Sequence, residues 1–187
     1  MISTAVFDLE TSDLNADSGI ILCAVIQSST RKTPIVIRTD DTNLNWKKGL
    51  RGDDSATVKK VQEALADHDV LCAHNGTRFD LPFLRTRALK WGIPRLPDIK
   101  VVDPLSIAWR KFRLKSNRLG NLSDYVGVKD KKTPLDMSLW MEAVLNGSRE
   151  AMDAIVEHCV ADVKVLAGVL KFVKPFIRVL DERGSAL

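Results

Sequence analysis

Hydrophobic residues in the first third of the chain occur in short blocks, a pattern typical of β-strands. The blocks are residues 2–11, 19–27 and 33–39, and the middle one, GIILCAVIQ, is almost wholly apolar. Only short polar segments separate them, so we expect hairpins and an antiparallel meander. Residues 40–54 are polar and include glycines, which predicts a loop.

The apolar period lengthens to that of a helix after residue 55, where Val58, Val61 and Leu65 recur at helical spacing. The pattern then predicts a strand at 70–74, a helix at 80–92, a strand at 98–103 and, last, a helix at about 148–173. The order βββαβα followed by helices predicts an α/β fold in three layers, with a mixed central sheet of about five strands flanked by helices.

Length and composition limit the alternatives. The chain has 187 residues, 45% of them hydrophobic and 28% charged, which suits one globular domain over residues 1–180 with a flexible tail at 181–187. The net charge of +4 would suit a polyanionic partner without requiring one. No apolar stretch has membrane-spanning length, no signal peptide is evident, and the three cysteines lie in apolar runs, so we expect a cytoplasmic protein with no membrane partner.

The first chemically unusual stretch is VFDLET, residues 6–11, because two carboxylates interrupt an apolar strand. Residues two apart in a strand project from the same face of the sheet, so Asp8 and Glu10 are expected side by side. Two like charges that close repel each other, and burying either one without compensation is costly.

Two later stretches carry further acids. In AHNGTRFDLPFL, residues 73–84, Asp80 stands where a helix should begin, which fits either a helix-terminal carboxylate or a functional one. In EHCVADVKVL, residues 157–166, His158 and Asp162 are four apart and therefore lie on nearly the same side of a helix, beside its apolar stripe. An aspartate in that position needs a strong partner.

These acids can converge on one place. Four carboxylates together would repel one another unless cations joined them, and hard oxygen ligands in that number are preferred by Mg²⁺ or Mn²⁺. Two such ions about 3.5–4 Å apart are an established arrangement for cleaving phosphodiesters.

The motifs FDLET, HNGTRFD and HCVAD, in this order, resemble those of the DEDD superfamily of 3′→5′ exonucleases. The resemblance extends from residue 6 to about residue 173. It implies a ribonuclease-H-like fold, two divalent cations (Mg²⁺ or Mn²⁺), and hydrolysis of single-stranded DNA or RNA from the 3′ end with release of nucleoside monophosphates. Two alternatives remain open: an RNA-trimming exoribonuclease, and an inactive nucleic-acid-binding module.

Carried over position by position, the resemblance assigns the metal-binding carboxylates and the residues that hold the terminal nucleotide. The former are Asp8, Glu10, Asp80 and Asp162, and the latter are Leu9 through its backbone, Thr11 and Asn75. The third motif departs from the superfamily, which has a Tyr four residues before the last Asp or a His five before it. Here His158 stands four before, so it is either a catalytic residue or a helix histidine bonded to Asp162 or to a backbone group.

Two other features have open interpretations. The basic run RKFRLKSNR, residues 110–118, is either a solvated face or a surface that contacts substrate phosphates through Arg110, Lys111 and Arg113. Asp103, which ends a strand, is either a helix cap or a residue that touches the site.

Overall fold

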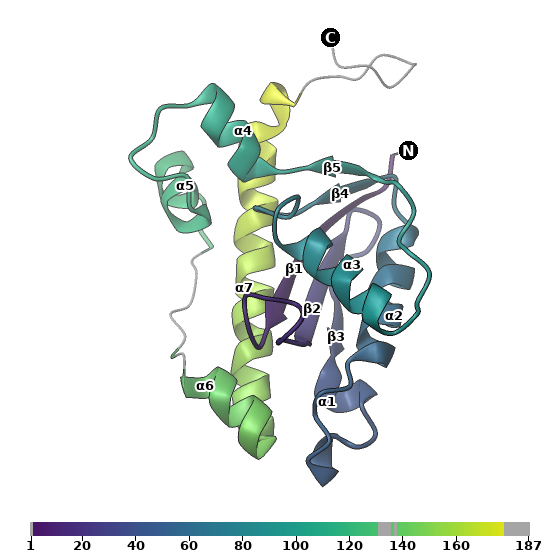
Figure 1. Cartoon of the computed structure of the whole chain (residues 1–187). Helices are drawn as coiled ribbons and strands as arrows, with labels where there is room; N and C mark the ends of the chain where they lie inside the picture. Colours follow the sequence, from purple (N-terminus) through teal and green to yellow (C-terminus); the bar gives the residue numbers. More distant parts are fainter. Residues whose placement is uncertain (1, 131–135, 137, 178–187) are drawn as a thin grey trace.

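Five strands form one mixed sheet in the order β3-β2-β1-β4-β5 (Figure 1). In this computed structural model the described residues are 2–130, 136 and 138–177, and the predicted tail at 181–187 lies outside them. The strands are β1 Thr4–Thr11, β2 Ile21–Ser28, β3 Ile35–Arg38, β4 Val70–Cys72 and β5 Lys100–Val102. Strands β1, β2 and β3 pair antiparallel, whereas β4 and β5 join β1 in parallel. The predicted meander and mixed sheet are confirmed.

Helices cover both faces of the sheet, which gives the predicted three layers (Figure 1). The longer elements are α2 Ser55–Ala66, α3 Asp80–Lys90, α4 Pro104–Lys111, α5 Leu119–Val126 and α7 Arg149–Val173, with the short α6 Ser138–Met141, η2 Glu142–Asn146 and η3 Lys174–Phe176. One face packs on α2 and α3, and the other packs on α7, which α4, α5 and α6 contact in turn. No described helix is long and apolar enough to cross a membrane.

The prediction of a loop at 40–54 is wrong in part. A single helical turn, α1 Thr39–Thr42, follows β3 directly, and a 3₁₀ turn, η1 Trp46–Lys48, comes shortly after it. Sequence periodicity cannot detect α1, because one polar turn has no apolar stripe. It is held by tertiary bonds instead: the Thr39 hydroxyl donates to the Ile21 carbonyl, and Arg149 of α7 forms an ion pair with Asp40 at 2.9 Å.

The alternation of side chains along β1 decides where its two carboxylates point. Ala5, Phe7 and Leu9 are buried in the core that includes α2 and α3, whereas Val6 belongs to the core under α7. Asp8 and Glu10 follow Val6 at intervals of two residues, so they project from the face that α7 covers. The sheet therefore presents both acids to the helix that carries the third motif.

Candidate active site

Helix α7 brings His158 and Asp162 to the carboxylates of β1. The Nε2 atom of His158 lies 3.9 Å from Glu10 Oε1 and 3.9 Å from Asp162 Oδ2. The imidazole thus stands between an acid of the strand and an acid of its own helix, as the four-residue spacing predicts. Trp140 of α6 meets the imidazole ring edge to face, with 6.4 Å between ring centroids, and limits its orientation.

Cys159, one of the three cysteines in apolar runs, lies directly against Asp8. Its Sγ atom is 3.6 Å from Asp8 Oδ2 and 3.5 Å from the Asp8 carbonyl oxygen. Burial, with the neighbouring Cys23 and Asp8, raises the pKa of the Cys159 thiol, so the thiol stays protonated and donates to the carboxylate. The signal in the sequence was its place beside His158 on the face toward the core.

Asp80 approaches the same strand from the opposite layer. It is the first residue of α3, its carboxylate is buried, and Oδ1 accepts a hydrogen bond from the Leu9 N–H at 3.1 Å. The N-cap position belongs to Phe79, so the carboxylate is directed to β1. Burial first, and then the charge of Asp8, raise the pKa of Asp80 well above its ordinary value. The raised pKa therefore reflects mainly the burial of this carboxylate and, second, the negative charge of Asp8 beside it.

That pKa shift leads to a testable stability effect. Below roughly pH 4 the Asp80 carboxyl is protonated in both states, but above it the unfolded chain releases the proton first, so folding stability falls as pH rises toward the folded pKa. Asp80→Asn removes this loss and keeps an acceptor for the Leu9 N–H. We expect the variant in EDTA to be more stable than the parent at pH 7, with the gap closing below roughly pH 4 in urea titrations.

The control for this measurement is Asp67→Asn, which changes an exposed carboxylate at the end of α2 and should stabilise the chain in EDTA at pH 7 less than Asp80→Asn does. If the parent is more stable than Asp80→Asn at pH 7 in EDTA, the unfavourable burial of the Asp80 carboxylate is contradicted.

The turn between β4 and α3 is fixed by Asp103. Asp103 Oδ1 accepts from the Asn75 N–H at 3.0 Å and caps α4 through the Leu105 N–H at 3.0 Å, while Oδ2 accepts from the Thr77 hydroxyl at 2.7 Å. Asn75 has a positive φ of 67°, which an asparagine tolerates. Gly76 is required, since a Cβ there would lie 2.3 Å from the Ala73 Cβ. Asp103 is therefore both the predicted cap and a support of the site.

A cleft of about 670 Å³ opens beside the carboxylates. Its lining includes Asp8, Asn75, Ser116, Arg118, Asn121 and Asp162. The basic run thus reaches the cleft through its last residues, whereas Arg110 and Lys111 at the end of α4, and Arg113 after it, are exposed and do not line it. The sequence did not single out Asn121 as a residue of the cleft. Its spacing of three residues from Arg118, about one helical turn, could have indicated that the two side chains lie on one side of α5.

The other predicted nucleotide contacts are placed as follows. The Leu9 side chain is buried on the α2 side of the sheet, so Leu9 could contact a nucleotide only through its backbone. Its N–H already donates to Asp80. The Thr11 hydroxyl donates to the Asp13 carbonyl at 2.8 Å. Their roles toward a substrate stay predictions.

The donor set fits a divalent cation. Asp8 and Glu10 place ligand atoms within 4.8 Å of each other and of the Cys159 sulfur, and Asp162 lies across the His158 ring. Carboxylate oxygens are the ligands that Mg²⁺ and Mn²⁺ prefer. A cation would offset the charge of Asp8, which after burial is the second cause of the raised Asp80 pKa. If a cation binds here, Asp8 and Glu10 would hold it, and the metal-binding roles of Asp80 and Asp162 stay predictions.

Comparison with known proteins identifies the family of this chain and similar polymerases. The RNase_H superfamily profile matches residues 5–173. The chain is 32% identical to the PolC-type DNA polymerase III of Ureaplasma parvum over 131 residues, and 26% identical to a DNA polymerase of Archaeoglobus fulgidus over 157 residues. These alignments cover 62% and 70% of the chain but only 9% and 20% of those polymerases.

Among solved structures, the family B DNA polymerase of Pyrobaculum calidifontis is similar, with a TM-score of 0.70 and 16% identity. The match covers 94% of this chain and 25% of that polymerase. At this identity the likeness bears on the fold alone, and it agrees with the ribonuclease-H-like fold that the motifs predict.

Proposed function

This chain belongs to the RNase_H superfamily, and on that premise we propose that it is a metal-dependent 3′→5′ exonuclease that removes nucleoside monophosphates from single-stranded ends. Membership supports nuclease activity in general. The observation that carries the finer proposal is the convergence of Asp8 and Glu10 from β1 with His158 and Asp162 from α7. Asp80, a buried carboxyl whose pKa is raised by burial and by the charge of Asp8, is the fourth carboxylate of the proposed site.

Each residue has a role that follows from its position. Two divalent cations, when bound to these carboxylates, would polarise the scissile phosphate and lower the pKa of the attacking water. We assign to His158 the acceptance of the proton that the water gives up, and its position 3.9 Å from a carboxylate on each side supports this role. The Cys159 thiol and the Leu9 N–H orient Asp8 and Asp80 respectively through hydrogen bonds.

DNA is the first substrate to test, because both curated relatives are named as DNA polymerases. The informative assay digests matched DNA and RNA oligonucleotides that carry a label at either the 3′ or the 5′ end. A 3′→5′ exonuclease releases a 3′ label at once as a mononucleotide, whereas a 5′ label passes through a ladder of shortening products. Immediate release of the 5′ label would overturn the polarity, and cleavage of RNA alone would identify the exoribonuclease.

The cleft also predicts which part of the basic run meets the substrate. Arg118 lines the cleft beside Asp8, so Arg118→Ala should weaken single-strand binding and reduce the slope of log affinity against log salt by about 0.7. Arg113→Ala is the matched control, since it removes an exposed arginine of the same run that does not line the cleft. Equal slopes for the two variants would mean that Arg118 contacts the substrate no more than Arg113 does.

A further inference from the structure

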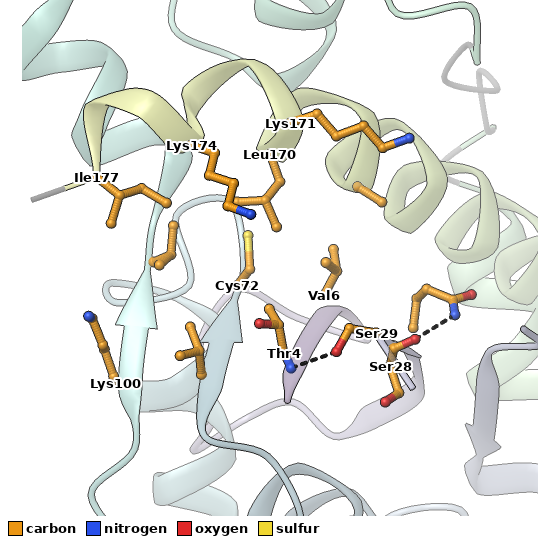
Figure 2. Close-up of a pocket in the computed structure, with 14 residues that line it drawn as sticks. Thr4, Val6, Ser28, Ser29, Cys72, Lys100, Leu170, Lys171, Lys174 and Ile177 are labelled. Atoms are coloured by element: carbon orange, nitrogen blue, oxygen red, sulfur yellow. Dashed lines mark hydrogen bonds between the residues drawn. The ribbon is translucent and has the colours of Figure 1, made fainter. Parts of the chain in front are cut away.

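A second cavity, of about 460 Å³, lies under the C-terminal end of α7, on the same sheet face as the carboxylates (Figure 2). Its floor is set by strand register. Thr4, Val70 and Lys100 form one row across β1, β4 and β5, and the next row is Val6, Cys72 and Val102. Asp8 follows Val6 by two residues on β1, so the cavity and the catalytic cleft are neighbours along that face, about 7 Å apart by strand rise.

The cavity wall is largely apolar. Val6, Cys72 and Val102 are buried in the core, and Leu170 and Ile177 line the helix side. Burial and the charge of Asp103 raise the pKa of Cys72 to about 12, so its thiol stays neutral and counts with the apolar wall. A mostly apolar cavity of this size, with a few polar groups, is typical of a small-molecule site.

The polar side chains that line the cavity are three lysines, hydroxyl groups and the amide of Gln27. Lys100, Lys171 and Lys174 stand at the rim, and none of the described residues that line the cavity is acidic. Figure 2 shows Lys174 directing its amino group from the helix toward the sheet, whereas the amino group of Lys171 points away along the helix. At the opposite wall the Ser29 hydroxyl accepts a hydrogen bond from the Thr4 N–H at 2.9 Å. An apolar body and a single anionic head complement this arrangement.

We propose that the cavity binds a small amphiphilic anion, a carboxylate with an aliphatic body, whose head pairs with Lys174 and Lys100 and whose body packs on Val6, Val70 and Val102. The site is separate from the nuclease cleft, and its test does not depend on nuclease activity.

The experiment is calorimetric titration of the whole chain with dodecanoate, kept below its micelle concentration, at low salt. Three matched ligands divide the contributions: butyrate keeps the head without the body, dodecanol keeps the body without the charge, and adenosine monophosphate offers a phosphate anion. We expect dodecanoate to bind with a dissociation constant below roughly a millimolar, and the other three to bind at least about tenfold more weakly.

Variants assign the site. Lys100→Glu combined with Lys174→Glu should weaken dodecanoate binding roughly tenfold, and Val70→Phe, which fills the cavity, should do the same by exclusion. Lys60→Glu, on exposed α2 surface away from the cavity, should leave binding as in the parent. Thermal melts with a single cooperative transition show that each variant is folded.

Three outcomes would overturn the proposal: no binding of dodecanoate by the parent, equal binding by the double lysine variant, or tighter binding of adenosine monophosphate to the same residues. A fourth contrary outcome comes from sedimentation at the titration concentrations. If the chain is a dimer and binds dodecanoate only when dilution separates the copies, the cavity is an interface between copies of the chain.

Discussion

Asp8→Asn should abolish nearly all nuclease turnover while leaving the protein folded. Asp8 lies at the centre of the site: it touches the Cys159 thiol, raises the pKa of Asp80 and shares the sheet face of Glu10. Its loss removes the carboxylate best placed to hold a cation. Metal ions contribute several kcal/mol to such reactions, and each ~1.4 kcal/mol is tenfold in rate, so we expect a loss of at least roughly a thousandfold.

The measurement is release of 3′-terminal mononucleotides with Mg²⁺ or Mn²⁺, and in EDTA the parent should be as inactive as the variant. Asp67→Asn, the exposed carboxylate at the end of α2, is the matched control and should retain full activity. Substantial cleavage by Asp8→Asn, or by the parent in EDTA, would exclude metal-dependent catalysis at this site. Isothermal titration with Mn²⁺ then distinguishes lost metal binding from lost chemistry.

The layered fold could be predicted from the sequence because local patterns of apolar residues identify its main elements. The apolar block in β2 and the long stripe of α7 each identify their element without reference to the rest of the chain. The single turn α1 could not be predicted, because bonds to Ile21 and Thr57 from distant segments hold it.

The meeting of the candidate site residues could be predicted in part for a similar reason. Alternation along β1 and the four-residue spacing on α7 each place a pair of side chains on one face. What local pattern could not supply is how separate segments meet. Arg118 and Asn121 reach the cleft through the path of the chain between α4 and α5, and Cys159 reaches Asp8 through the seating of α7 on the sheet.

His158→Ala should lower kcat on the order of a hundredfold, the usual range for removal of a general base, with KM nearly unchanged. The imidazole lies 3.9 Å from both Glu10 Oε1 and Asp162 Oδ2, so it borders the place where a water would meet the carboxylates. Histidine is the side chain that most often accepts a proton in general acid–base catalysis. Its spacing of four residues from Asp162 differs from that of the DEDD exonucleases that the motifs resemble. This spacing directs the imidazole toward the carboxylates.

Added imidazole distinguishes a histidine that transfers a proton from one that only holds neighbouring side chains in place. If His158 transfers a proton, free imidazole in the space left by His158→Ala should restore part of kcat, whereas it should not affect Asp8→Asn. Glu157→Ala, the exposed neighbour on α7, controls for effects on the helix and should keep its rate. A His158→Ala variant that retains most of its kcat would show that the water loses its proton without this residue, and a large loss without rescue would assign His158 to holding Glu10 and Asp162 in place.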